Sequence, residues 1–213
     1  MNDWPPYAKP YRASPPEGSA AIALPIRDDL RFFKLCYHSL LAFTDYRFML
    51  TVVDNMSDIK TRQYLESIRK NHNINVLSYQ KEHNLAAEWN LGLRFMFAFA
   101  NVKYGAVLTP TVVFEPFWLS ATIRAIDANK VTSVFTPSEE EPELVVFTRE
   151  IYEKLGGFRE DVEDPARDFH ARIMKDGGAT TFSPTFLHKF KVNGFDPRRE
   201  ERQETQEATN ARA

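Results

Sequence analysis

Two carboxylates follow a largely apolar run in the segment V-V-D-N-M-S-D. Asp54 comes directly after residues 48–53, and Asp58 lies four residues further along. An ionised carboxylate accepts hydrogen bonds from N–H and O–H groups, so acids at the end of a buried strand can bind a polar ligand. The same acids can instead satisfy a turn or cap the helix that follows. Both interpretations place Asp54 and Asp58 between a strand and a helix.

Short apolar runs alternate with helical patterns on both sides of this turn. The runs predict strands over residues 20–26, 48–53, 74–79, 105–108, 131–135, 144–148 and 180–182. Apolar residues at helical spacing predict helices over residues 29–43, 57–70, 85–101, 117–129, 149–155 and 167–175. This alternation predicts an α/β fold with a mostly parallel central sheet flanked by helices. Ligands bind beyond the carboxyl ends of such strands, where Asp54 and Asp58 are expected to lie.

Composition favours a soluble, cytoplasmic protein. Hydrophobic residues make up 43% of the 213 residues and charged residues 26%, with a formal net charge of −2. This charge gives no global basic field of the kind that favours nucleic acid or anionic membranes. No stretch approaches the roughly 20 apolar residues of a membrane span, and the N-terminus does not read as a signal peptide. The single cysteine, Cys36, excludes an internal disulfide and fits a reducing compartment.

Several motifs occur in an order that resembles the family 2-like glycosyltransferases with the GT-A fold. The resemblance extends from about Ala20 to His188. Its segments are A-I-A-L-P-I-R at 21–27, C-Y-H-S-L-L at 36–41, V-V-D-N-M-S-D at 52–58, N-L-A-A-E-W-N-L-G at 84–92, L-G-G-F-R-E at 155–160 and D-F-H-A-R at 168–172. The resemblance implies a Rossmann-like domain that binds a nucleoside-diphosphate sugar over residues 20–195. Residues 1–19, rich in Pro, Ser and Gly, are expected to form an extended arm, and residues 196–213 a polar tail.

The resemblance also implies which residues bind the donor. They are Pro25, Arg27, Asp54, Asn84, Asn90, Thr109, Thr111, Gly156 and Gly157. Asp54 would accept hydrogen bonds from the base or ribose. Asn84 and Asn90 would lie near the base and hold the loop, with helix capping or loop hydrogen bonding as the alternative. The two glycines would let backbone approach the sugar or acceptor closely, and a helix C-cap is the other interpretation.

The metal-binding motif of the family is replaced in this chain. Relatives have a D-x-D-like pair of acids after the fourth strand, which binds Mn²⁺ or Mg²⁺ beside the diphosphate. Here the aligned residues are Thr109-Pro110-Thr111. Three explanations stay open: a metal held by fewer ligands with His188 among them, loss of catalysis, or neutralisation of the diphosphate by cations. The candidate cations are Arg27, Lys81, Arg94 and Lys189.

Two acids are candidates for the catalytic base that the resemblance implies. Inverting relatives use an acid upstream of the D-L-x-x-R segment to take a proton from the acceptor, and Ala166 stands at the aligned position. Asp164 lies just upstream and would reach the site through a small insertion, so we place it ahead of Asp168. The alternatives are an exposed acidic loop for Asp164 and a cap or first-turn acid for Asp168.

The sequence therefore predicts a hexosyltransferase-like enzyme that moves a sugar from a nucleoside-diphosphate sugar to a hydroxyl. A glycan, a small molecule and a modified nucleic-acid base are the candidate acceptors. The alternative is a catalytically degenerate module that binds a nucleotide or sugar without turnover, which Thr109 and Thr111 support. A nucleotidyltransferase would need a glycine-rich phosphate loop after the first strand, and residues 25–29 contain no glycine.

Overall fold

A seven-stranded sheet forms the centre of the computed structural model, which describes residues 15–71, 73–135, 144–182 and 187–189. The strands lie in the order β3-β2-β1-β4-β7-β6-β8. Their bounds are β1 (Ser19–Ile26), β2 (Phe48–Asn55), β3 (Ile74–Tyr79), β4 (Val102–Leu108), β6 (Ser133–Phe135), β7 (Leu144–Thr148) and β8 (Thr180–Phe182). β1 to β4 run parallel to one another, and β7 runs antiparallel to both of its neighbours. The predicted mostly parallel sheet is confirmed.

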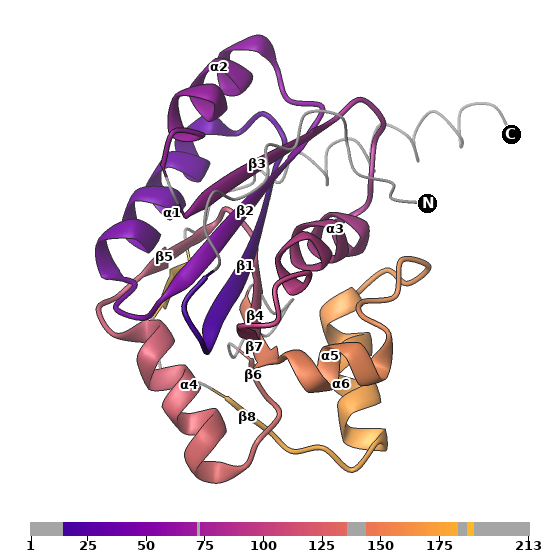
Figure 1. The fold of residues 1–213 in the computed structure, drawn as a ribbon. Coiled ribbons are helices and arrows are strands. Elements are labelled where there is room, and N and C mark those ends of the chain that lie inside the picture. The colour runs from indigo at the N-terminus through magenta and orange to yellow at the C-terminus, as the bar shows by residue number, and fades with distance from the viewer. Residues whose placement is uncertain (1–14, 72, 136–143, 183–186, 190–213) are drawn as a thin grey trace, which may run out of the picture.

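In the part of the chain that the structure describes, three helices cover each face of this sheet (Figure 1). One face carries α1 (Leu30–Phe43), α2 (Ile59–Ile68) and α4 (Trp118–Asn129), and the other carries α3 (Leu85–Phe97), α5 (Arg149–Leu155) and α6 (Pro165–Lys175). Successive residues of β1 enter the two cores in turn: Ile22 and Leu24 pack on one side, Ala21 and Ala23 on the other. Because both faces are covered, the strand reads as a continuous apolar run.

Small residues let α3 lie close against the sheet. A Cβ atom added to Gly92 would lie 2.8 Å from the Cβ of Ala23. Trp89, on the same helix, is 1% exposed, and its indole N–H donates to the Leu108 carbonyl at 3.2 Å. Trp89 is therefore a core residue. This close packing fixes the start of α3 near the carboxyl ends of the strands.

A second, two-stranded sheet was not predicted from the sequence. It pairs β5 (Val112–Phe114) with β9 (Leu187–Lys189) in antiparallel register, and His188 lies opposite Val113. Strands of three residues are too short to show the alternation that identifies a strand. The side chains of β9, including those of His188 and Lys189, lie outside the described part of the chain.

The ends of several elements differ from the prediction. The helix predicted over residues 85–101 ends at Phe97. The helix predicted from residue 167 begins at Pro165, because Asp164 caps it and proline suits a first helical position. Residues 1–14 of the predicted arm lie outside the described residues, and β1 already begins at Ser19. The predicted tail over 196–213 lies wholly outside the described residues.

No helix in the part of the chain that the structure describes has the length and hydropathy of a membrane span.

Candidate functional site

The carboxyl ends of the parallel strands form one edge of the sheet, and most of the predicted donor-binding residues lie there. Pro25 is in register with Val53, and the following pair is Ile26 with Asp54. Thr109 follows directly after β4, which runs beside β1. Residues that are far apart in the sequence therefore meet at the edge where α/β sheets bind ligands.

Asp54 is held in a tight turn at the end of β2. It is 1% exposed, and its Oδ1 accepts the Ser57 backbone N–H at 3.0 Å. Within the part of the chain that the structure describes, its second oxygen, Oδ2, has no hydrogen-bond partner. Asp58 instead caps α2, accepting the Thr61 N–H at 2.7 Å, and this bond lowers the pKa of Asp58. The two acids thus differ: Asp58 caps a helix, whereas Asp54 Oδ2 has no hydrogen-bond partner among the described residues.

The turns after β1 and β2 are tied together by Asp28. Its Oδ1 accepts the Asp58 N–H at 2.6 Å, its own N–H donates to Ser57 Oγ at 3.3 Å, and its carbonyl accepts the Thr61 hydroxyl at 3.0 Å. Asp28 has a φ of 61° and Met56 a φ of 62°, a left-handed conformation that is uncommon for side-chain-bearing residues. Such strain persists where surrounding contacts over-determine the backbone. The two turns therefore form one preorganised unit.

The loop between β3 and α3 lies against these turns. Asn55 Nδ2 donates to the His83 carbonyl at 2.8 Å, and its Oδ1 accepts the His83 N–H at 3.1 Å. Arg27, at the end of β1, forms an ion pair with Glu82 at 2.6 Å. The side chains of Arg27 and Glu82 are 39% and 64% exposed, so the pair is open to solvent and to exchange with an anionic ligand.

Asn84 and Asn90 of α3 both bind the loop of residues 156–160. Asn84 caps the helix by accepting the Ala87 N–H at 2.9 Å, and its Nδ2 donates to the Glu160 carbonyl at 2.7 Å. Asn90, 1% exposed, donates to the Phe158 carbonyl at 2.8 Å and to the Glu160 carboxylate at 3.0 Å. These bonds bring the loop to the same edge as Asp54.

Gly156 and Gly157 end α5 and begin this loop. Both have positive φ, 74° and 84°. Gly156 is the C-cap of α5, so the helix-capping interpretation holds for it. The guanidinium of Arg172, on α6, donates to the Leu155 carbonyl at 2.9 Å and to the Gly157 carbonyl at 2.8 Å. The loop is thus held from α3 on one side and from α6 on the other.

The two candidate bases lie on the first turn of α6, and both are ion-paired. Asp164 is the N-cap: its Oδ1 accepts the Arg167 N–H at 2.8 Å and its Oδ2 lies 3.3 Å from the Arg167 guanidinium. Asp168 pairs with Arg172 at 2.7 Å and lies 3.8 Å from Arg159. The side chains are 21% and 19% exposed. Asp168 also contacts the loop through Arg159, whereas the ionic partner of Asp164 among the described residues is the exposed Arg167.

Thr109 and Thr111 bind each other at the end of β4, where their hydroxyl oxygens lie 2.8 Å apart. Across residues 15–71, 73–135 and 144–182, no three acidic, histidine or cysteine side chains gather as a metal site would require. Neutral hydroxyls that bind one another do not fit a divalent cation that prefers carboxylate ligands. His188 pairs with Val113, two residues beyond Thr111 in the chain, so its backbone lies near this position.

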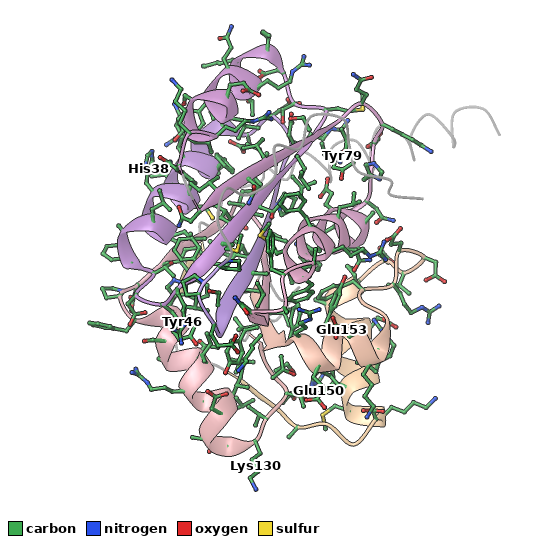
Figure 2. All side chains as sticks on the ribbon, viewed as in Figure 1. His38, Tyr46, Tyr79, Lys130, Glu150 and Glu153 are labelled. Carbon is green, nitrogen blue, oxygen red and sulfur yellow. The ribbon has the colours of Figure 1, made fainter. Side chains whose placement is uncertain are left out.

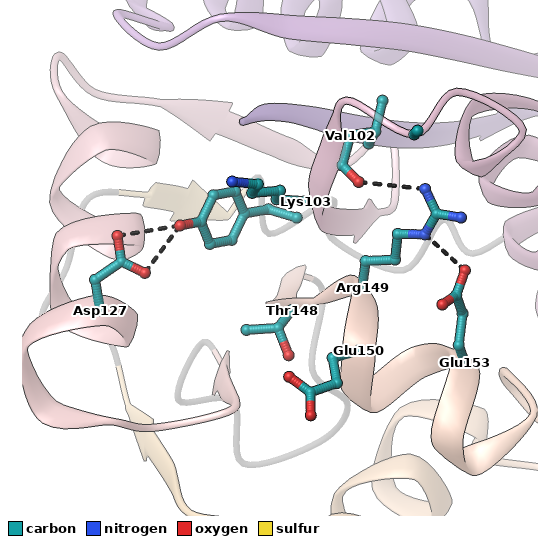
Figure 3. A pocket seen from close by; sticks show the side chains of 9 residues that line it. Val102, Lys103, Asp127, Thr148, Arg149, Glu150 and Glu153 are labelled. Carbon is teal, nitrogen blue, oxygen red and sulfur yellow. Dashed lines mark hydrogen bonds and ion pairs between the residues drawn. The ribbon is translucent and has the colours of Figure 1, made fainter. Parts of the chain in front are cut away.

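A cavity of about 500 Å³ lies at the opposite, amino edge of the sheet (Figure 3). Tyr104 donates to Asp127 across it, and Arg149 pairs with Glu153. Burial and the bond to Asp127 raise the pKa of Tyr104. In the view of Figure 2, Tyr79, which ends β3, lies in the upper part of the molecule and Glu150 and Glu153 lie in the lower half. This cavity is separate from the candidate donor site.

Sequence reasoning assigned no role to several residues that shape the site. Asn55 binds the His83 carbonyl, Tyr152 binds Asn90, and Arg172 binds the Gly157 carbonyl. Glu160 accepts one bond from Asn84 and one from Asn90. Asn90 and Glu160, for example, are 70 residues apart in the chain. Sequence patterns such as helix caps and strand alternation involve residues a few positions apart, so they cannot identify this pair.

A family model for glycosyl transferase family 2 matches residues 22–179. The chain belongs to glycosyl transferase family 2. The fold is also similar to that of a mannosyltransferase, PcManGT from Pyrobaculum calidifontis, in complex with GDP-Man and Mn²⁺ (TM-score 0.71, 17% identity, covering 88% of this chain and 62% of that chain). A second similar structure is S. aureus TarS 1–349 in complex with UDP-GlcNAc (TM-score 0.67, 14% identity, covering 84% and 60%).

These structural similarities establish the GT-A fold for this member of the family. The chain spans about three fifths of the length of both solved structures. No curated protein sequence matches it.

Proposed function

We propose that this chain transfers a sugar from a nucleoside-diphosphate sugar to an acceptor hydroxyl. Its membership of glycosyl transferase family 2 and the donors GDP-Man and UDP-GlcNAc in similar structures support such a donor. The observation in this chain that carries the proposal is Asp54. This carboxylate ends a buried strand at the ligand-binding edge, with one oxygen used by the turn and the other without a partner among the described residues.

The donor half of the proposed site is the pair of turns after β1 and β2. Asp54 Oδ2 accepts a hydrogen bond from an N–H or O–H of the nucleoside, and Pro25 lines the same pocket. Arg27 offers a guanidinium to the diphosphate in exchange for its exposed ion pair with Glu82. Because the described residues do not fit a carboxylate-bound metal, none of these roles depends on Mn²⁺ or Mg²⁺.

The acceptor half is the loop of residues 156–160 with the first turn of α6. The acceptor oxygen attacks the anomeric carbon, the bond from that carbon to the diphosphate oxygen breaks, and the nucleoside diphosphate leaves. The acceptor proton passes to the carboxylate of Asp164, with Asp168 as the second candidate. Attack in line with the leaving group inverts the anomeric configuration. A glycan, a small molecule and a modified nucleic-acid base can each supply the acceptor hydroxyl.

A donor screen tests the proposal directly. The chain is mixed with a panel that includes UDP-GlcNAc and GDP-mannose, with and without Mn²⁺, and thermal shift and release of nucleoside diphosphate are measured. We expect one donor to raise the Tm and to be hydrolysed slowly, with the hydrolysis lost in Asp164→Asn. Asp176→Asn, at the other end of α6, is the matched control and keeps the activity. Failure of every donor to bind at millimolar concentration contradicts the proposal.

The second candidate function is donor binding without turnover. The mutually bonded Thr109 and Thr111 support it, because both are neutral and the resemblance implies a pair of acids at these positions. Under this alternative, a donor raises the Tm but no nucleoside diphosphate is released, and Asp164→Asn changes neither result. The same screen therefore separates the two functions.

A further inference from the structure

We infer that Asn90 and Glu160 form a positioning pair that sets the shape of the loop of residues 156–160 for sugar transfer. This inference deepens the proposed function and rests on it. Neither residue is assigned to the reacting atoms. Asn90 is buried in α3, and Glu160 lies at the surface of the loop.

The amide of Asn90 uses its whole hydrogen-bonding capacity inside the protein. Nδ2 donates to the Phe158 carbonyl at 2.8 Å and to Glu160 Oε1 at 3.0 Å. Oδ1 accepts the Phe158 N–H at 3.0 Å and the Tyr152 hydroxyl at 3.0 Å. A primary amide has two N–H groups and two lone pairs, so no capacity is left for a ligand. Asn90 therefore acts through the loop.

The partners fix which way the amide points. The Phe158 N–H can only donate, so it requires the amide oxygen, whereas the Phe158 carbonyl requires the amide nitrogen. Burial raises the pKa of Tyr152 to about 12, so its hydroxyl is protonated at neutral pH and donates to the same oxygen. The nitrogen is then directed to the Glu160 carboxylate.

Phe158 anchors the loop beneath this pair. It is 3% exposed, with ring centroids 5.1 Å from Trp89 and 4.5 Å from Phe169. Because the anchor is packed in the core, a change at Asn90 displaces the exposed part of the loop rather than the buried ring. That exposed part leads through Glu160 to Asp164, the cap of α6 and the preferred base.

Glu160 is held by neutral donors alone. Its carbonyl accepts from Asn84 and its carboxylate from Asn90. Among the described residues Glu160 has no ion pair, whereas Asp161, Asp164 and Asp168 are each paired with an arginine. The position of the Glu160 side chain therefore depends on the Asn90 amide.

The first test replaces the amide with a carboxylate of the same shape. In Asn90→Asp, carboxylate oxygen faces the Phe158 carbonyl and the Glu160 carboxylate with no hydrogen between them. We expect donor hydrolysis at pH 8 to fall about thirtyfold, while the Kd of the nucleoside diphosphate changes less than about twofold. Activity recovers toward low pH in this variant only, because a protonated carboxyl can donate. Hydrogen exchange at the Phe158 amide becomes faster, because repulsion between the new carboxylate and the Phe158 carbonyl weakens the neighbouring bond from the Phe158 N–H to Oδ1.

The second test swaps the two groups. Glu160→Gln keeps an oxygen that can accept from Asn90, so hydrolysis stays within about threefold of wild type. The double variant Asn90→Asp/Glu160→Gln recovers about fivefold over Asn90→Asp alone, since the glutamine amide can donate to the new carboxylate. Asn101→Asp is the matched control. It removes a bond to the Pro15 carbonyl at the amino edge and leaves both the exchange at Phe158 and the hydrolysis unchanged.

The outcomes separate this inference from the proposed function. Loss of hydrolysis in Glu160→Gln with a protected Phe158 amide would overturn the positioning role, because Glu160 would then act on the substrate itself. Unchanged exchange in Asn90→Asp, or no rescue by the swap, also overturns it. If wild-type protein neither binds nor hydrolyses any sugar nucleotide, the proposed function fails, and the exchange data still decide whether the pair holds the loop.

Discussion

The two halves of the candidate site are built from contacts of different range. In the turn after β2, Asp54 accepts the Ser57 N–H and Asp58 accepts the Thr61 N–H, each from three residues away. In the turn after β1, Asp29 accepts the Phe32 N–H, also three residues away. In the loop of residues 156–160, Asn90 reaches Phe158 across 68 residues of chain. Asp28 joins the two turns to each other, yet each turn has its own local bond.

Because of this difference, the two halves should form at different stages of folding and respond differently to substitutions. A local cap forms with the helix that it begins, so the turns need only β1 and β2 side by side. The loop takes its shape only after α3, α5 and α6 have packed, because its hydrogen-bond partners lie on other elements. We therefore expect a substitution that crowds the loop to lower stability, and loss of the Asp54 charge in the turns to weaken ligand binding.

The largest expected effect is at Gly157. A Cβ atom there would lie 2.8 Å from Asn90 Oδ1, and the φ of 84° is unfavourable for alanine. We expect Gly157→Ala to lower the free energy of unfolding by about 3 kcal/mol, from backbone strain and overpacking together. Urea denaturation measures this change.

Gly156→Ala is the matched control for that substitution. Gly156 has a similar φ of 74° but nothing within 4 Å of an added Cβ, so only the backbone term remains, about 1 kcal/mol. If Gly156→Ala and Gly157→Ala lower the free energy of unfolding equally, contact with Asn90 does not constrain the loop.

The next effect is on ligand binding in the turns. Asp54→Asn keeps an oxygen for the Ser57 N–H but removes the charge from the free acceptor. We expect nucleoside-diphosphate affinity, measured by calorimetry with UDP and GDP, to fall about tenfold with little change in stability. Asp45→Asn, which removes a charge from an acid bound to Ser120, should leave affinity unchanged. A loss of stability without a loss of affinity would assign Asp54 to the turn alone.

Replacing either of two threonines with valine should change stability by a smaller amount, in opposite directions. The Thr61 hydroxyl donates to the Asp28 carbonyl and ties the two turns together, so Thr61→Val should destabilise by about 1 kcal/mol. The Thr51 hydroxyl is buried without a partner among the described residues, so Thr51→Val should stabilise by up to about 1 kcal/mol. Thermal unfolding of both variants checks the signs, and two losses would contradict the assignment for Thr51.

The smallest effect is the response to alkaline pH. Tyr152 ionises near pH 10 in an unfolded chain, and burial raises its pKa to about 12 in the fold. Its contribution to stability is complete below pH 10 and is lost as pH rises toward 12, because the unfolded chain releases the proton first. At pH 10.5 this loss is less than about 1 kcal/mol, and Tyr152→Phe should show a shallower decline of stability with pH. If stability declines with pH equally in wild type and Tyr152→Phe, other tyrosines cause the sensitivity to alkaline pH.

The parts of the fold that sequence reasoning predicted well share a local signal. The strand over Ile74–Tyr79 and the helix over Arg149–Leu155 have the predicted bounds, because periodicity and capping depend on near neighbours. The strands Val112–Phe114 and Leu187–Lys189 were missed, since three residues carry too little pattern. The roles of Asp164 and Asp168 in catalysis stay predictions, with their ion pairs now described.

By itself, the sequence determined the α/β class, the order of the main elements and the presence of Asp54 at a strand end. Each of these depends on residues a few positions apart, which interact as soon as the local backbone forms. Only the tertiary structure decided that Asn90 and Arg172 would both bind the loop of residues 156–160, or that Thr109 and Thr111 would bind each other. Those contacts depend on how closely helices pack on the sheet, and no spacing along the chain encodes a distance across it.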